Sequence, residues 1–232
     1  MSDGLKGGVM QRVRIWDLPT RLFHWALVIC VVFSVVSAKL GGNAIEWHMR
    51  SGYTVLALVS FRILWGLVGG RWSRFSSFFY SPAALMRYLR NEPRPDDHFE
   101  VGHNPLGAFS VLAMLAWIFL QVGSGLVADD EIATTGPLIK FVSGKVSSVL
   151  TSYHTTFGQF GLYILVALHV AAVFYYATRR RKSLVTPMFS GDKHVAHDVP
   201  STHDSWATRL FALTLLGACA AAVYLLLSLG DG

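Results

Sequence analysis

Long apolar runs, separated by short polar segments, dominate this chain of 232 residues. Five runs contain almost no charge: 22–38, 51–70, 105–128, 146–178 and 210–230. Arg62 is the only Asp, Glu, Lys or Arg within them. A helix that crosses the hydrocarbon core of a bilayer needs about 20 mostly apolar residues, with about 17 as the lower limit. The pattern therefore predicts five membrane-spanning segments, near residues 20–39, 47–69, 104–127, 149–177 and 207–229.

The spanning segments must be helical, because hydrocarbon offers no hydrogen-bond partner to the backbone. We therefore predict an all-α integral membrane protein, a four-helix transmembrane bundle followed by a fifth C-terminal transmembrane helix. The polar segments divide the chain into four parts: an arm (1–19), the bundle (20–190), a linker (191–206) and the last helix (207–232). Within 71–103, aromatic, leucine and arginine residues alternate as in a helix that lies on the membrane surface.

Composition and charge placement support this interpretation. Hydrophobic residues make up 53% of the chain, the mean hydropathy is +0.44, and only 15% of residues are charged, against roughly a quarter in soluble domains. The net charge is +6, but the basic residues flank apolar helices and form no separate basic domain, so no nucleic-acid partner is expected. Apart from Arg62, fifteen Lys and Arg residues lie on the N-terminal side of the membrane and four on the other. The positive-inside rule then predicts a cytoplasmic N-terminus.

Four of the nine histidines lie within the predicted spans. His24 lies in the first span, His48 at the head of the second, and His154 and His169 in the fourth. Ionisable side chains at membrane depth are rare and mark functional sites, because hydrocarbon penalises an unsatisfied polar group. The remaining five lie in or beside cytoplasmic loops: His98, His103, His194, His197 and His203.

The depth of each span histidine follows from the direction of its helix. His24 lies near the cytoplasmic side, and His48 lies near the outer side, where the second span begins. His154 shares the outer level, whereas His169 lies roughly 22 Å deeper at a rise of 1.5 Å per residue. Two level pairs result, His24 with His169 and His48 with His154. Because a haem iron takes two axial ligands and imidazole is a common one, the pairs predict two bis-histidine haem b groups.

Helix rotation and nearby glycines agree with ligation. At about 100° per residue, His169 is offset from His154 by about 60° around the helix, as expected for partners on different spans. Gly52 and Gly158 each follow a ligand by four residues, and small residues there leave room for a flat macrocycle. The alternative for any single histidine is a hydrogen-bonded contact between helices. Four histidines in two matched pairs favour the ligand interpretation.

Other polar residues near the spans have two interpretations each. Arg62 lies at the level of the inner pair and either binds a haem propionate or extends to the cytoplasmic interface. Arg21 has the same two interpretations, with interface anchoring preferred. His103 either replaces His24 as a ligand or, as we prefer, caps the third span or contacts the surface. The acidic residues 129–131 form either a solvated turn or a negative surface for a periplasmic partner.

No motif for another chemistry accompanies these residues. The chain has no CxxCH, so it attaches no c-type haem itself, and Cys30 and Cys219 are expected to be core residues of the spans. We find no carboxylate dyad, nucleophile constellation or phosphate loop, and therefore predict no catalytic residues.

Short motifs recur in order along residues 10–190: Arg21-Leu22-Phe23-His24-Trp25, Trp47-His48, Gly102-His103-Asn104-Pro105, Tyr153-His154 and Leu168-His169-Val170-Ala171-Ala172. With these motifs the chain resembles the bacterial cytochrome b561 family, in the broad sense that includes b-type subunits of membrane-bound nickel–iron hydrogenases. The resemblance implies a four-helix dihaem bundle in the bacterial inner membrane, with the four span histidines as ligands. It also implies electron exchange between the quinone pool and a periplasmic or membrane partner. The fifth span is additional to that form, and the third span shows no quinone-binding signature.

These observations predict a membrane cytochrome that carries electrons through two haem b groups between a quinone and a redox protein such as a periplasmic c-type cytochrome. A second hypothesis in the same class is the membrane anchor of a hydrogenase-like complex, which passes electrons to quinone. A third hypothesis, from another class, is a transporter or scaffold without haem, whose histidines bind metal ions or protons. In each case membrane lipid surrounds the chain.

Overall fold

The computed structural model describes residues 10–94, 97, 99–132, 134–196 and 198–230. Within these residues five helices are long and apolar enough to cross a membrane, so the predicted all-α membrane bundle with a fifth helix is confirmed. They are α1 (Leu18–Leu40), α2 (Ala44–Val68), α4 (Pro105–Gly125), the continuous helix Gly144–Thr178 with its parts α5 (Gly144–Ser152) and α6 (Gln159–Thr178), and α8 (Trp206–Ser228). The predicted loop histidines His98 and His197 lie outside the described residues.

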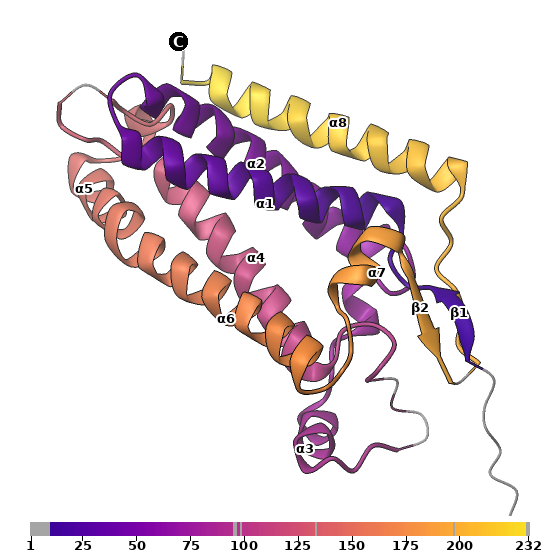
Figure 1. The fold of residues 1–232 in the computed structure, drawn as a ribbon. Coiled ribbons are helices and arrows are strands. Elements are labelled where there is room, and N and C mark those ends of the chain that lie inside the picture. The colour runs from indigo at the N-terminus through magenta and orange to yellow at the C-terminus, as the bar shows by residue number, and fades with distance from the viewer. Residues whose placement is uncertain (1–9, 95–96, 98, 133, 197, 231–232) are drawn as a thin grey trace, which may run out of the picture.

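The helix α2 lies at the centre of the arrangement. It packs against α1, α4 and α8, while α6 packs against α4 on the other side of the bundle. In Figure 1 α8 runs along the outside of the α1–α2 pair, away from α6. Buried side chains of α8, among them Ala212 and Cys219, join the main hydrophobic core, which includes Val59 and Trp65 of α2. The fifth helix is therefore an addition to the outside of a four-helix bundle.

Local sequence signals set the ends of the helices. Asp17, Asn104 and Ser205 each precede a spanning helix, and their side chains accept a hydrogen bond from the backbone N–H three residues later. The connection between α1 and α2 turns at Gly41 and Gly42, with φ values of 64° and 53°, where glycine avoids the steric penalty of a side chain. This short connection makes α1 and α2 antiparallel neighbours.

Large apolar side chains cover the outer surfaces of the spanning helices. Ile29 of α1, Leu168 of α6 and Leu213 of α8 are all exposed, as are many of their neighbours. A water-soluble protein rarely presents such continuous apolar surface, whereas lipid tails cover it without penalty. The exposed apolar surface thus agrees with a bundle embedded in a bilayer.

A two-stranded antiparallel ribbon joins the N-terminal arm to the linker before α8. Strand β1 (Gln11–Arg14) pairs with β2 (Asp192–Val195), in a register that sets Arg14 opposite Asp192. Together with the segments 15–17, 69–80, 99–104, 185–191 and 198–205, the ribbon covers one end of the bundle, and we call this assembly the cap. The sequence patterns predicted the arm and the linker as separate polar segments. Their pairing was not predicted, because it depends on contacts between residues about 180 positions apart.

Asp17 organises the cap. Its carboxylate is fully buried and accepts four hydrogen bonds, from the Thr20 N–H at 2.8 Å, the Gly70 N–H at 3.1 Å, the Ser73 hydroxyl at 3.1 Å and the Trp65 indole N–H at 3.3 Å. One side chain thus connects the start of α1 to the end of α2 and the segment that follows it. Charged acceptors form the stronger hydrogen bonds of proteins, so the cap depends on this carboxylate.

The segment predicted to lie on the membrane surface contains one short amphipathic helix, α3 (Pro82–Arg90). Ser81 caps its beginning, and Asn91 ends it in the left-handed conformation with φ 58°. Met86 and Leu89 are exposed beside Arg87 and Arg90, as expected for a helix whose apolar side meets lipid. A further short helix, α7 (Val185–Ser190), connects α6 to β2.

Candidate cofactor-binding site

The four span histidines form two pairs, in the combinations that the sequence predicts. The ring centroids of His24 and His169 lie 6.4 Å apart, and those of His48 and His154 lie 5.9 Å apart. The first pair lies toward the cap, and we call it the cap-side pair; the second, near the α1–α2 turn, is the far-side pair. Each pair joins one of the first two spans to the helix Gly144–Thr178.

Both separations suit two imidazoles that share one metal ion. A histidine nitrogen binds a transition metal such as zinc at about 2 Å, which sets two axial nitrogens about 4 Å apart, and roughly 1 Å more to each ring centre gives centroids about 6 Å apart. A direct hydrogen bond between two rings would bring them closer than this. The pairs therefore fit a metal held between their rings.

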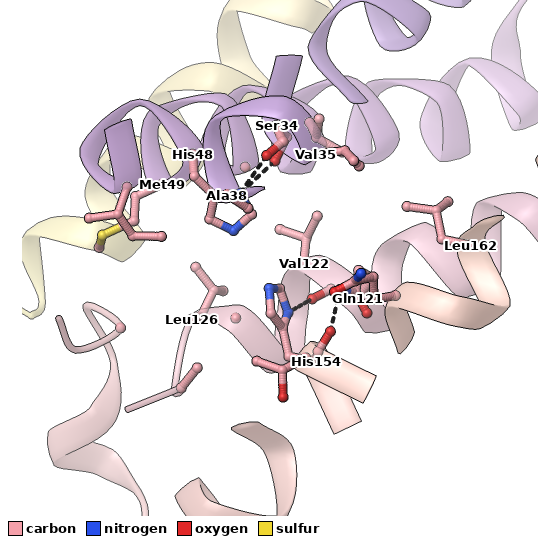
Figure 2. Close-up of a pocket in the computed structure, with 18 of the residues that line it drawn as sticks. Ser34, Val35, Ala38, His48, Met49, Gln121, Val122, Leu126, His154 and Leu162 are labelled. Carbon is pink, nitrogen blue, oxygen red and sulfur yellow. Dashed lines mark hydrogen bonds between the residues drawn. The ribbon is translucent and has the colours of Figure 1, made fainter. Parts of the chain in front are cut away.

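Hydrogen bonds at the far-side pair leave the ligating nitrogens free. The Nδ1 of His48 lies 2.9 Å from the carbonyl oxygen of Ser34, and the Nδ1 of His154 lies 2.8 Å from that of Gln121 (Figure 2). A carbonyl oxygen only accepts, so each Nδ1 carries the proton and donates it. Each Nε2 then keeps its lone pair, and donation to a backbone carbonyl is the usual arrangement behind a metal-bound histidine.

A cavity of about 320 Å³ separates His48 from His154 and is lined by residues of α1, α2, α4 and α6. Figure 2 shows the two rings facing one another across it. Gly52 lines this cavity, and a Cβ atom built there would meet nothing within 4 Å, so Gly52 leaves open space beside His48. Gly158 is placed differently, since a Cβ there would meet the Gln121 Oε1 at 1.8 Å. The absence of a side chain at Gly158 allows α4 to pack closely.

The helix around His154 is π-helical from Tyr153 to Gly158. Two side chains of α4 bond its carbonyl groups: the Gln121 Nε2 donates to His154 O at 2.9 Å, and the Trp117 Nε1 donates to Gly158 O at 2.8 Å. A π turn contains one residue more than an α turn. Residues after it are therefore rotated by about 100° around the helix axis, relative to residues before it, from their positions in a regular α-helix. The estimate of about 60° between His154 and His169, made for a regular α-helix, is therefore wrong.

The cap-side pair has a different environment. The His24 Nδ1 is buried without a hydrogen-bond partner among the described residues. Arg21, one turn earlier, directs its guanidinium to the cap, where it donates to the Phe189 carbonyl oxygen and lies 3.9 Å from Asp204. This geometry favours the anchoring interpretation of Arg21. Its Nε atom is buried without a hydrogen-bond partner among the described residues.

Arg62 is buried inside the bundle, with 3% of its surface exposed. Its guanidinium lies over the ring of Phe75 at 5.1 Å, and its Nη1 atom has no hydrogen-bond partner among the described residues. Extension to the membrane interface, one of the two interpretations of this residue, is therefore wrong. The sequence does not reveal this, because the covering residues come from the segment after α2.

His103 packs within the cap, between Trp16 and Phe78, at 4.7 Å from each ring centroid. Asn104 caps α4, so the expectation that His103 caps this helix is wrong, although the residue is only partly buried and keeps some exposed surface. Burial, and then the positive charge of Arg62, lowers the pKa of His103 to about 3, so the ring is neutral at pH 7. Its Nδ1 is buried without a partner among the described residues. His24, and not His103, faces His169.

The acidic residues 129–131 form a turn that satisfies its own backbone. The Asp129 carboxylate accepts from the Glu131 N–H, and the Asp130 carboxylate accepts from the N–H groups of Ile132 and Thr134. Such local bonds are typical of aspartate in turns. This geometry supports the solvated-turn interpretation.

Sequence reasoning missed the residues that hold the ligands in place. Gln121 and Trp117 bond the π-helical segment, and Ser34 accepts from His48, yet none of the three has a distinctive motif. Asp17 had a usable signal, because an aspartate two residues before a proline-started helix is typical of an N-cap. No sequence signal indicates that the same carboxylate also accepts hydrogen bonds from Trp65 and Gly70.

Comparison with known proteins gives consistent matches. The family model described as prokaryotic cytochrome b561 matches residues 15–191. Relatives from several bacteria carry the name "Probable Ni/Fe-hydrogenase B-type cytochrome subunit". The protein of Bradyrhizobium diazoefficiens is 23% identical, and the match covers 78% of this chain and 85% of that protein. The protein of Azotobacter chroococcum is 25% identical, with 81% of this chain and 91% of that protein covered. The protein of Cupriavidus necator is 24% identical, with 80% of this chain and 88% of that protein covered. No solved structure matches the chain at the same level of significance.

Proposed function

The chain belongs to the prokaryotic cytochrome b561 family and is a membrane b-type cytochrome, and we propose that it carries electrons through two haem b groups between a hydrogenase-like redox protein and the quinone pool. One observation carries the proposal: two histidine pairs at two levels, with centroids 6.4 and 5.9 Å apart. The haem iron supplies one-electron redox chemistry when it is bound. Because both of its axial positions would be occupied by imidazole, such a centre suits electron transfer better than oxygen binding.

The residues of this chain have three tasks in that function. His24 and His169 would hold one haem, and His48 and His154 the other. The carbonyl groups of Ser34 and Gln121 hold the far-side rings with Nε2 directed into the cavity. Packed apolar helices keep bulk water away from the path between the two levels, which are roughly 22 Å apart along the helix.

The choice of partner rests on the relatives. The sequence motifs alone favour a periplasmic c-type cytochrome as the partner, with a hydrogenase-like complex as the second hypothesis. Relatives from several bacteria bear the name of nickel–iron hydrogenase cytochrome subunits and align over most of their length. These names support a hydrogenase-type protein as the redox partner, and we propose the quinone as the second electron carrier. A c-type cytochrome is the competing partner.

Optical spectroscopy tests the cofactor. The protein is purified in mild detergent from cells with ample haem, and a reduced-minus-oxidised spectrum and a pyridine haemochrome assay are recorded. We expect two haem b per chain. A colourless protein would contradict the proposal and support a transporter or scaffold whose histidines bind metal ions or protons.

The partner is tested by reduction in membranes. Haem reduction that follows the addition of hydrogen, and that needs a co-expressed hydrogenase, supports the hydrogenase-type partner. Reduction by quinol, with reoxidation by added c-type cytochrome and no response to hydrogen, supports the competing partner.

A further inference from the structure

Arg62 is a buried cation without a counter-ion in contact. Among the described residues no hydrogen bond or ion pair engages its guanidinium, and its one aromatic contact, the ring of Phe75 at 5.1 Å, is neutral. Only 3% of the residue is exposed. Burying an ionised group without a partner is strongly unfavourable, so an anion from outside the described residues would stabilise this site.

The nearest candidate counter-ion, Asp17, is already engaged. Its carboxylate accepts from the indole N–H of Trp65, which lies three residues after Arg62 on α2, so the two charged groups lie in one region of the fold. However, its two carboxylate oxygens already accept four hydrogen bonds, from Thr20, Trp65, Gly70 and Ser73. Asp17 therefore offsets part of the positive charge at a distance and leaves the donors of Arg62 free.

His103 provides a second donor beside Arg62. Its ring is held between Trp16 and Phe78, and its Nδ1 is buried without a partner among the described residues. After burial, the charge of Arg62 is the largest further cause that lowers the pKa of this ring, so the two residues lie in the same region of the fold. Two side chains, each with a buried nitrogen that lacks a partner among the described residues, thus lie near the cap end of the bundle.

The level of Arg62 connects this pocket to the cap-side histidines. Arg62 lies six residues before the end of α2 at Val68, and His24 lies six residues after the start of α1 at Leu18. Because α1 and α2 are antiparallel, both residues lie about 9 Å from the cap end of their helices. A ligand held by His24 and His169 therefore has Arg62 at its own depth.

We propose that Arg62 and His103 bind the propionate carboxylates of the haem held by His24 and His169. The inference rests on the proposed function, since the anion arrives with that haem. An arginine fork matches a carboxylate with two parallel hydrogen bonds, and a neutral imidazole donates a third. The propionates would then point toward the cap, away from the far-side pair.

A change in reduction potential follows from this contact. A positive charge beside the propionates opposes the extra positive charge of ferric iron, so Arg62 favours the reduced state. In Arg62→Gln we expect the reduction equilibrium of the cap-side haem to become at least tenfold less favourable, which corresponds to about 59 mV for one electron. Arg62→Lys keeps the charge but loses the fork, and should show a smaller shift. His103→Leu should weaken retention of the cap-side haem.

The experiment is a spectroscopic redox titration of the purified full chain. Arg62→Gln, Arg62→Lys and His103→Leu are compared with Arg50→Gln, a control whose exposed side chain pairs with Glu46 near the far end of the bundle. Each change is repeated in a His24→Ala background, which leaves only the far-side haem. We expect the Arg62 shift in the two-haem protein and its absence in that background, with both potentials unchanged in Arg50→Gln.

A second measurement identifies the anion. The protein is reconstituted with a haem whose propionates are methyl esters, and the difference between wild type and Arg62→Gln is measured again. If the propionates are the anion, this difference disappears. A shift that persists with the ester, a shift of both haems, or a change of less than threefold would each overturn the inference. If no haem binds to the wild-type chain, the proposed function itself fails.

Discussion

Gln121 and His154 bond to each other in both directions. The ring Nδ1 of His154 donates to the backbone carbonyl of Gln121 at 2.8 Å, and the side-chain amide of Gln121 donates to the backbone carbonyl of His154 at 2.9 Å. The first bond sets the tautomer of the ring, and the second occupies a carbonyl group of the π-helical segment. A single residue of α4 thus controls both the orientation of a proposed ligand and the helix that carries it.

We first predict that Gln121→Leu weakens the far-side site. The substitution keeps the backbone acceptor but removes the side-chain donor to the His154 carbonyl, and the loss of one such hydrogen bond costs about 1 kcal/mol. Residues behind metal ligands typically contribute ten- to hundredfold in affinity, and we expect about tenfold weaker retention of the far-side haem. Haem content after detergent washing measures the effect. Thr156→Val, at an exposed position of the same π segment, is the control, and an equal loss in both variants would contradict the role of Gln121.

Single histidine substitutions should remove one haem each. His24→Ala removes the ligand of the cap-side pair, and we expect one haem per chain, with the potential of the far-side haem unchanged. His48→Ala should have the complementary result, because the two pairs share no ligand. Pyridine haemochrome assays and redox titrations distinguish the two. His203→Ala, in the exposed linker, should retain both haems. Loss of the far-side haem from His24→Ala would refute the pairing.

Asp17→Asn should destabilise the cap. An amide offers one acceptor oxygen and an NH₂ group, which would face the N–H donors of Trp65, Gly70 and Thr20. Hydrogen bonds to charged groups contribute about 1.5–3 kcal/mol each, so we expect a loss of about 2 kcal/mol or more. Thermal unfolding in detergent measures it. Glu46→Gln is the control, because it breaks the ion pair with Arg50, in which the Glu46 side chain is 65% exposed. We expect this change to lower the free energy of unfolding by about 0.5 kcal/mol or less. An equal effect of the two changes would exclude a special role for Asp17.

The loop after α3 should respond to acid through Asp97. Hydrogen bonds from the Arg87 guanidinium, at 2.7 and 2.9 Å, and from the Arg94 N–H lower the pKa of Asp97 to about 2. The folded pKa lies below the unfolded value of about 3.9, so the contact is fully present above about pH 4 and is lost as the pH falls through about 2. Carboxyl NMR of labelled protein measures this titration.

Arg87→Gln is the matched variant for that titration. Without the guanidinium we expect the pKa of Asp97 to return toward about 4, since the largest cause of its depression is gone. Arg90→Gln, on the same short helix, should leave the titration unchanged. A pKa near 2 in Arg87→Gln would show that another group holds the carboxylate.

The orientation of the chain is also a prediction. Fifteen Lys and Arg residues on the N-terminal side predict a cytoplasmic N-terminus and, after five spans, an outer C-terminus. Alkaline phosphatase fused after residue 230 should therefore be active, whereas a fusion in the linker before α8 should be inactive. The reverse activities would invert the membrane orientation, and would place the cap on the outer side.

Much of the architecture could be read from the sequence, because the bilayer imposes simple local rules. A run of about 20 apolar residues has to form a helix whatever its neighbours are, so the five spans follow from the hydropathy pattern alone. The rise of the helix then gives the depth of each histidine and matches His24 with His169 without any tertiary contact. These inferences use one segment at a time.

The details of the site depend on contacts that no single segment contains. The π-helical turn at His154 exists beside Gln121 and Trp117, whose donors occupy its carbonyl groups. The burial of Arg62 depends on Phe75 and the cap above it. Periodicity cannot show either, because side chains from distant parts of the chain provide the bonds and the cover.

The sequence by itself determined the number of spans, the levels of the four histidines and the motifs of the family. Only the tertiary structure decided which nitrogen of each far-side ring is free, where Arg21, Arg62 and His103 point, and how β1 and β2 close the cap. The physical reason is the distance along the sequence over which each interaction acts. Hydrophobic length and helical rise act within about 20 residues, whereas a hydrogen bond or a buried charge is set by whichever residues the fold brings beside it.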